Sequence, residues 1–374
     1  MTDKRQTRLL MGIPHPRTKG GPPAEVPLLV AYLRSHPEFS IRTFYYGSRH
    51  NGVEAQESIP IKVLATLTTY IEFLWHLAIF KPHVIHINTA FGSYSLLRDA
   101  PFALTAWLFR LKLLFKMHGS LDEIVHSPSP TIRSLSWVFF KGASIVGVLS
   151  ETERREFQSR YGNKVRLVKN IISSSITNRD NQYAFPPDCI YGLFVSRIDP
   201  RKGLSDLIAA LPSIVSEVPS FRIIVAGDGP SMEECRQAAE KNGSHQYIYW
   251  LGWVDADSLG ELFSIAHVFI FPTNYPEGMP IALLSAMQAG LPIVTTKCRF
   301  VNDFLVEGKN YVAINKGDPA DMHRQVVRLL NDPELQNRMR VENPLFVNGY
   351  GIETVGEEFV RLYNELTGRN THSE

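Results

Sequence analysis

The stretch that decides the fold is Glu277-Gly278-Met279-Pro280-Ile281-Ala282-Leu283-Leu284-Ser285-Ala286-Met287. It places a carboxylate and a Gly-x-Pro turn directly before an apolar, helix-forming run. Proline is favoured in the first position of a helix, so the pattern predicts a helix that begins at Pro280, with backbone N–H groups of Gly278 and Met279 near its start. Such a start attracts phosphate, and Glu277 can accept hydrogen bonds from hydroxyl groups beside it. The combination favours a sugar phosphate or nucleotide-sugar as ligand, although an ordinary αβ unit with a surface glutamate would show the same local pattern.

Around this stretch, short apolar runs alternate with amphipathic segments, which is typical of βαβ units and parallel sheets. The first half contains four predicted strands, Arg8–Ile13, Val84–Asn88, Lys112–Met117 and Ser144–Leu149. A polar stretch with two prolines interrupts the alternation at residues 173–188 and reads as a linker. The pattern therefore predicts an α/β protein with two similarly built domains, residues 1–172 and 189–345, and a cleft between them.

The bulk composition is that of a globular chain with room for two cores. It has 374 residues, of which 44% are hydrophobic and 20% charged. Three cysteines, widely separated and without metal-ligand spacing, indicate reduced thiols of a cytoplasmic protein: Cys189, Cys235 and Cys298. The first residues do not resemble a secretion signal, and no uncharged apolar run reaches ~18 residues. We therefore expect a cytoplasmic chain that at most lies on a membrane surface.

The net charge of +2 conceals an asymmetry between the two halves. Residues 1–180 carry 23 Lys and Arg against 13 Asp and Glu, whereas residues 181–374 carry 16 against 24. A basic first half suggests an anionic partner. An anionic membrane or a lipid-linked phosphate acceptor fits better than nucleic acid, because the chain has no Lys/Arg-rich run and no nucleic-acid recognition motif. Solvated charge without any partner remains an alternative.

Two cations follow the predicted strand Tyr191–Ser196. Arg197 and Lys202 lie in a predicted loop at the carboxyl end of a parallel strand, where open α/β sheets bind ligands. Facing the helix start near Gly278, they could hold a diphosphate between them. Two charges exposed to solvent are the competing interpretation, and Arg201 is expected to point to solvent.

Other turns add weaker signals. Gly227 and Gly229 follow another strand, and a tight turn that lets a ligand approach the backbone explains them better than a dinucleotide fingerprint. Gly20 and Gly21 form a second candidate approach after the first strand, weakened by two following prolines. His118 follows a strand and could bond substrate hydroxyls, although such a histidine is more often structural.

In their order and spacing, these pieces together resemble a family 4 retaining glycosyltransferase of the GT-B architecture. The resemblance covers nearly the whole chain and rests on individually weak motifs: Gly20-Gly21, Pro82 to His86, His118-Gly119, Ser150 to Glu153, Asn170, Arg197, Lys202-Gly203, Gly227 to Pro230, Leu251-Gly252 and the Glu277 segment. It implies two Rossmann-like domains, the first binding the acceptor and the second the nucleotide-sugar. It also implies a last helix, within residues 346–374, that crosses back to the first domain, and neither a catalytic metal nor another cofactor.

Roles for individual residues follow from the same resemblance. Arg197 and Lys202 would grip the donor diphosphate, Glu277 would hold hydroxyls of the donor sugar, and His118 would contact that sugar from across the cleft. The remaining donor contacts would come from the glycine turns, from the stretch after the strand at 248–251, and from the helix start: Gly20, Gly21, Gly227, Gly229, Gly252, Val254, Gly278, Met279, Pro280 and Ser285.

The chain departs from the family pattern in two places. Ser285 stands eight residues after Glu277, where the family has a second glutamate that holds the nucleotide ribose. Its hydroxyl lies ~7.5 Å along the helix from Pro280 and could still reach ribose through a water, at a cost of ~1–2 kcal/mol in donor binding. Lys297-Cys298-Arg299-Phe300 replaces a small-residue and glycine loop.

These observations predict transfer of a sugar from a UDP-, GDP- or ADP-sugar to a saccharide or lipid-linked saccharide, in surface polysaccharide biosynthesis. A non-catalytic GT-B-like subunit of a transferase complex, and a phosphorylase on the same scaffold, are the alternatives.

Overall fold

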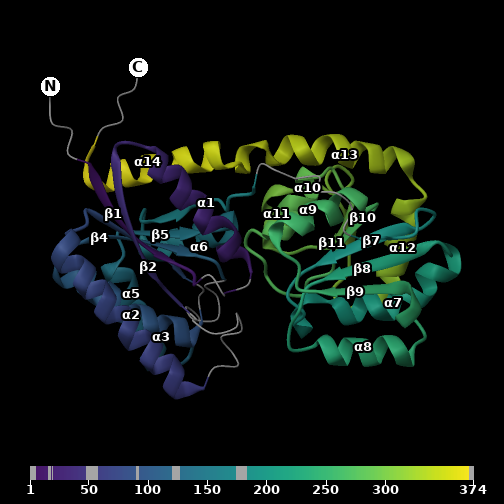
Figure 1. Ribbon diagram of the computed structural model, residues 1–374, viewed down its shortest axis with the longest axis horizontal. Helices are drawn as coiled ribbons and strands as arrows, with labels where there is room; N and C mark the ends of the chain where they lie inside the picture. Colours follow the sequence, from purple (N-terminus) through teal and green to yellow (C-terminus); the bar gives the residue numbers. More distant parts are fainter. Residues whose placement is uncertain are drawn as a thin grey trace. The chain divides into compact units, whose positions relative to one another are not determined.

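The computed structural model describes residues 6–15, 18, 20–47, 58–89, 92–119, 127–173 and 183–369. The chain forms two compact units (Figure 1). Unit 1 comprises Met1–Ile171 and Tyr350–Glu374, and unit 2 comprises Ile172–Gly349. Most of the predicted linker, residues 174–182, lies outside the described residues.

Unit 1 is built on a six-stranded parallel sheet with the strand order β2-β1-β3-β4-β5-β6. Its strands are β1 (Thr7–Ile13), β2 (Phe39–Tyr45), β3 (Val84–Thr89), β4 (Lys112–Met117), β5 (Ile145–Val148) and β6 (Val165–Leu167). Its helices are α1 (Gly21–Ser35), α2 (Ile59–Phe80), α3 (Ser93–Leu108), α5 (Pro130–Gly142), α6 (Glu151–Tyr161) and α14 (Ile352–Thr367).

Side chains alternate between the two faces of this sheet, as the pleat requires. On β3, Ile85 and Ile87 belong to the apolar core that also holds residues of α2, α3 and α5. His86 points the other way, and its Nδ1 lies 2.7 Å from the hydroxyl of Tyr363 on α14. The last helix of the chain therefore packs within unit 1, next to α1, where the hydroxyl of Tyr32 donates to Glu357 at 2.7 Å (Figure 1).

Unit 2 contains a second six-stranded parallel sheet, with the order β12-β11-β10-β7-β8-β9. Its strands are β7 (Ile190–Val195), β8 (Phe221–Ala226), β9 (Ile248–Gly252), β10 (Val268–Phe271), β11 (Ile293–Thr296) and β12 (Val312–Ile314). Its helices are α7 (Leu204–Glu217), α8 (Met232–Lys241), α9 (Ala256–Ile265), α10 (Ile281–Gln288), α11 (Arg299–Phe304), α12 (Pro319–Leu330) and α13 (Pro333–Val347). Helices α9, α10 and α11 cover one face of this sheet, and α7, α8 and α12 the other (Figure 1).

The strand order places a topological switch point in unit 2. The chain builds β7, β8 and β9 outward in one direction, and then returns to build β10, β11 and β12 in the other. Strands β7 and β10 are neighbours, with Val268 opposite Gly192 and Phe269 opposite Leu193. In open α/β sheets the connections after two such strands leave in opposite directions, and the crevice at their carboxyl ends is where ligands bind. The α/β prediction with two similar units is confirmed.

One sequence-based expectation needs correction. Helix α10 begins at Ile281, one residue later than predicted, because Pro280 keeps an extended conformation with φ −74° and ψ 115° and serves as the N-cap. In addition, α2 has the length and hydropathy of a membrane-crossing helix, although the charged residues Lys62 and Glu72 interrupt its apolar run. Length and composition alone are weak grounds for a span, since core helices meet the same criteria.

Candidate functional site

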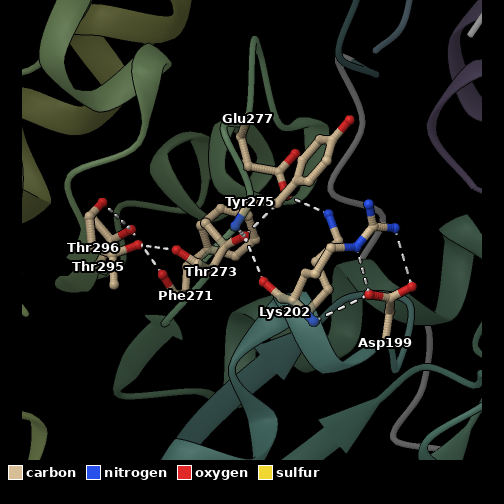
Figure 2. A network of polar contacts seen from close by, with 9 residues as sticks. Asp199, Lys202, Phe271, Thr273, Tyr275, Glu277, Thr295 and Thr296 are labelled. Carbon is tan, nitrogen blue, oxygen red and sulfur yellow. Dashed lines mark hydrogen bonds and ion pairs between the residues drawn. The ribbon is translucent and has the colours of Figure 1, made fainter. Parts of the chain in front are cut away.

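The candidate site of unit 2 lies at the switch point between β7 and β10. Arg197 and Lys202 follow β7, whereas Thr273, Tyr275 and Glu277 follow β10. Lys202 donates to the Oε1 of Glu277, and the same oxygen accepts from the hydroxyl of Thr273 at 3.2 Å (Figure 2). The structure thus brings together two predicted residues that are far apart in the sequence.

The loop that carries Lys202 is held rigidly. Asp199 caps the turn at Pro200–Lys202 by accepting the backbone N–H of Arg201 at 3.1 Å. The guanidinium of Arg201 donates to both carboxylate oxygens of Asp199, at 2.9 and 3.3 Å. These hydrogen bonds hold the pKa of Asp199 below its usual value, in spite of partial burial. Arg201, expected to point to solvent, is exposed but lies in this pair, and its Cζ is also 4.9 Å from the centre of the Tyr275 ring.

Arg197 differs from its neighbours in having no such partner. Its side chain is exposed, and its guanidinium makes no hydrogen bond or ion pair with any residue that the structure describes, although its charge helps to lower the pKa of Asp199. Since Arg201 is tied to Asp199 and Lys202 to Glu277, Arg197 is the cation of this loop that is available to an anion. Guanidinium groups suit phosphate because they donate two parallel hydrogen bonds.

The start of α10 supplies further donors. Pro280 has no capping side chain, and the first intrahelical bond runs from the N–H of Leu284 to the carbonyl of Pro280 at 3.1 Å. The N–H groups of the first turn, residues 281–283, therefore have no acceptor within the helix. The side chain of Met279 is buried, so it anchors the turn, and Ser285 is half-buried one turn further along the helix.

Several residues that support Glu277 were missed by sequence reasoning. The N–H of Phe300 at the start of α11 donates to the carbonyl of Glu277 at 3.1 Å. The hydroxyl of Thr296, at the end of β11, donates to the carbonyl of Thr273, and the hydroxyl of Thr295 donates to that of Phe271 at 2.9 Å (Figure 2). The segment at 297–300, which departs from the family pattern, thus helps to position the loop. These contacts form because β10 and β11 are neighbours in the sheet, and this strand order cannot be derived from the sequence.

The glycines of this region serve backbone packing. A Cβ on Gly227 would lie 1.9 Å from the carbonyl oxygen of Ser196, and one on Gly229 would lie 2.2 Å from that of Ile198. Gly203 has φ 74°, and a Cβ there would lie 2.0 Å from the carbonyl oxygen of Pro272. The turn after β8 therefore fits against the loop of Arg197, and the loop of Lys202 against the end of β10. Donor contacts of Gly227, Gly229, Gly252 and Val254 stay predictions.

In unit 1 the structure places the predicted residues at the ends of β1 and β4. Gly20 is the N-cap of α1 with φ 124°, and no atom lies within 4 Å of where its Cβ would be, whereas Gly21 is the first residue of the helix. The imidazole of His118 is buried, with its side chain 5% exposed, and its Nε2 lies 3.2 Å from the Oδ1 of Asn88. Its contact with a donor sugar stays a prediction.

A buried charge pair lies beside His118. Lys116 on β4 donates to Glu25 on α1, and also to the carbonyl of Lys169 at 3.0 Å. Burial raises the pKa of Glu25 and lowers that of Lys116. Burial, together with the charge of Lys116 and the neighbouring His86, holds the pKa of His118 well below its usual value, so that the imidazole is neutral at pH 7. Among the described residues, no three His, Cys, Asp or Glu side chains gather as metal ligands.

Two parallel six-stranded sheets with helices on both faces define the GT-B architecture, and the comparison with solved structures confirms this class of fold. The sucrose-phosphate synthase of Thermosynechococcus elongatus superimposes with a TM-score of 0.77 at 19% identity, covering 98% of this chain and 100% of that one. Anabaena Alr3699/HepE in complex with UDP and glucose gives a TM-score of 0.71 at 16% identity over 96% of this chain and 100% of that one.

Sequence comparison points to the same class of proteins. Residues 175–344 match the family model of the glycosyl transferases group 1. The alpha-monoglucosyldiacylglycerol synthase of Acholeplasma laidlawii is 25% identical over 183 residues, which are 49% of this chain and 45% of that protein. The chain thus spans about half the length of the first curated relatives that it matches.

Proposed function

We propose that the chain is a glycosyltransferase that moves a sugar from a nucleotide-sugar to a saccharide or lipid-linked saccharide acceptor, with retention at the anomeric carbon and without a metal. One observation carries the proposal. An unpaired arginine, Arg197, and a paired Lys202–Glu277 lie together at the switch point of the sheet, beside the helix start of α10. Cations and free N–H groups suit a diphosphate, whereas a carboxylate suits sugar hydroxyls.

In the proposed reaction, the bond between the anomeric carbon and the diphosphate oxygen breaks as the bond to the acceptor oxygen forms on the same face of the sugar. The departing diphosphate takes the acceptor's proton. Negative charge grows on that diphosphate, so Arg197, Lys202 and the first turn of α10 would stabilise the transition state more than the ground state. Glu277 would orient the donor sugar, and the bonds from Thr273 and Phe300 hold it in place.

The nature of the donor and acceptor is supported by relatives. HepE was crystallised with UDP and glucose, and the Acholeplasma relative is named for a glycosylated diacylglycerol. A UDP-, GDP- or ADP-sugar is the proposed donor, and a growing surface polysaccharide or a lipid-linked saccharide at the cytoplasmic side of the membrane is the proposed acceptor. The basic first half of the chain favours an acceptor that carries phosphate.

A thermal-shift screen with UDP, GDP, ADP and their common sugar conjugates tests the proposal. Ligand binding stabilises the native state by RT ln(1 + [L]/Kd), which amounts to ~2.7 kcal/mol when the ligand is at 100 times Kd. We expect a rise in Tm with one nucleotide family, lost in Arg197→Ala. Arg201→Ala is the matched control, because Arg201 is already engaged by Asp199. It should keep most of the shift.

The same screen separates the alternatives. No shift with any nucleotide would overturn the proposal in favour of a non-catalytic subunit. If a donor is found, NMR of the glycoside product tests retention directly, and inversion at the anomeric carbon would contradict that part. A requirement for inorganic phosphate in place of a nucleotide-sugar would indicate a phosphorylase.

A further inference from the structure

The outer side of α2 is apolar, which is unusual for the exposed side of a helix. Its exposed residues recur at helical spacing and include Leu64, Leu67, Ile71, Trp75 and Ile79, with Ile71 65% and Trp75 57% exposed. None of the exposed residues of α2 is charged. The two charged residues of the helix, Lys62 and Glu72, are half-buried at its sides. A helix on the surface of a water-soluble domain normally shows charged and polar residues there.

Helices α3 and α5 continue this surface. The buried sides of α2, α3 and α5 share one apolar core, so their outer sides face the same way (Figure 1). Trp107 and Leu108 on α3 and Trp137 on α5 are exposed, and the rings of the two tryptophans meet edge to face at 5.7 Å. We use the term apolar face for the exposed apolar side chains of these three helices. Exposed apolar side chains that recur on three neighbouring helices mark an interaction surface.

Among the residues that the structure describes, the exposed charged side chains that border the apolar face are cations. Arg110 and Lys112 follow the C-terminal end of α3, and Arg133 and Lys141 lie on α5. The Nζ of Lys141 lies 5.7 Å from the centre of the Trp137 ring. On α2, α3 and α5, every residue of which the structure describes, Glu72 is the one carboxylate that is not fully buried. Apolar side chains with tryptophans and a basic border are the composition of a surface that lies in the interface of an anionic bilayer.

We propose that the apolar face of unit 1 docks onto a lipid bilayer that contains anionic lipids, with α2 lying in the plane of the membrane. The inference goes beyond the proposed transfer reaction, and it stands without it. Basic side chains would pair with lipid headgroups, while Ile71, Trp75 and the tryptophans of α3 and α5 would enter the boundary between headgroups and acyl chains.

An in-plane position follows from the packing of α2. Its inner side is part of the core of unit 1, with Phe73 fully buried against Tyr70 and Phe102. The hydroxyl of Tyr70 also lies 2.7 Å from that of Thr105 on α3. To cross a membrane, α2 would have to leave this core and expose its apolar partners. Docking by one side requires no such rearrangement.

Vesicle flotation of the full chain tests the proposal. The vesicles contain phosphatidylcholine alone or with phosphatidylglycerol, and neither donor nor acceptor, so the result is independent of activity. We expect flotation with the anionic vesicles, weakened at high salt. The double variant Ile71→Glu, Trp75→Glu should lose on the order of tenfold or more of this binding. The matched control Val341→Glu, Leu345→Glu changes residues of α13 that are 62% and 61% exposed, and it should float like the wild type.

Tryptophan fluorescence gives a second readout. The chain has five tryptophans, and Trp250→Phe, Trp253→Phe leaves the three of the apolar face. On anionic vesicles their emission should shift to the blue, and brominated acyl chains should quench it. Equal Tm values for wild type and the α2 variant show that folding is retained.

Four outcomes would overturn the proposal. The wild type fails to float with any vesicle, or the α2 variant floats equally well. Resistance of the bound chain to alkaline extraction would show that α2 crosses the membrane. Self-association that the α2 variant abolishes, without any vesicle binding, would show that the apolar face is a protein interface.

Discussion

Lys202 and Glu277 form an ion pair that joins the loop after β7 to the loop after β10. The pair is largely shielded from solvent, and the ring of Tyr275 lies 5.1 Å from the Nζ of Lys202. One carboxylate oxygen of Glu277 is thus occupied by Lys202 and Thr273, whereas Arg197 on the same loop is unpaired. The arrangement fixes the position of the carboxylate before any ligand arrives, which is a requirement for efficient electrostatic catalysis.

Replacing Glu277 tests its role toward the donor. Glu277→Gln keeps the shape of the side chain but removes its charge, so we expect turnover to fall ~10²-fold or more. Stability should change by only ~1–2 kcal/mol, because Lys202 keeps its contact with the Tyr275 ring. Steady-state kinetics and urea unfolding measure the two effects. Glu307→Gln, which removes an exposed pair with Lys297, is the control, and near-normal turnover in Glu277→Gln would remove the central assignment.

Ser285 offers a gain-of-function test. In the glycosyltransferases that this chain resembles, a glutamate at this position holds the ribose. Ser285→Glu should therefore lower the KM for the donor by roughly 5–30-fold, equivalent to ~1–2 kcal/mol, with little change in kcat, because the contact is remote from the reacting bond. Kinetics with varied donor concentration would show it. A fall in kcat without a change in KM would contradict a ribose-binding position.

The close approach at Gly203 predicts a large loss of stability. Gly203→Ala forces a Cβ to within 2.0 Å of the carbonyl oxygen of Pro272, so the loop of Lys202 must move away from β10. We expect a loss of more than ~3 kcal/mol by denaturant unfolding. Gly308→Ala is the matched control, with φ 76° against 74° but no atom within 4 Å of the new Cβ. It should cost only ~1–2 kcal/mol for the left-handed conformation.

Two buried histidines predict an acid-sensitive unit 1. Burial lowers the pKa of His86 to about 3 and holds that of His118 well below normal, whereas both titrate near 6.5 when unfolded. Between those values the unfolded chain binds more protons, so the free energy of unfolding should fall as the pH decreases below about 6.5, by up to ~1.4 kcal/mol per pH unit for each histidine. His86→Leu removes one of the two protons that the unfolded chain takes up, so it should reduce the slope of the free energy of unfolding against pH. Urea unfolding at pH 7, 6 and 5 measures it, and an unchanged slope would be inconsistent with a neutral, buried His86.

The pair of Lys116 and Glu25 should show strong coupling. Lys116→Met leaves Glu25 buried without its cation, and we expect a loss of ~3–5 kcal/mol in the free energy of unfolding. The double variant Lys116→Met, Glu25→Gln should recover most of that loss. The neutral side chain can stay buried and still accept the hydrogen bond from the N–H of Ile171. A double-mutant cycle by urea unfolding gives the coupling, and additive losses would exclude it.

Much of the fold was predictable because buried parallel strands are short, apolar and regularly spaced. The central strands β1, β3, β4 and β7 were all predicted within two residues at either end. Three of the four edge strands were missed, β2 at Phe39–Tyr45, β6 at Val165–Leu167 and β12 at Val312–Ile314, whereas the edge strand β9 was predicted. Strand β2 (FSIRTFY) has polar residues among its apolar ones, and β6 and β12 have three residues each, which is too short for a recognisable apolar run.

For the site, the sequence by itself determined which side chains lie in the loops after the strands. Arg197, Lys202 and Glu277 stand in predicted loops because local periodicity fixes where each strand stops. It also determined the charge asymmetry and the apolar content of α2. Only the tertiary structure decided that β7 lies beside β10, and hence that Lys202 pairs with Glu277 while Arg197 stays unpaired. It likewise decided which side of α2 is exposed. Strand order and burial depend on contacts between residues far apart in the chain, and no local pattern encodes these contacts.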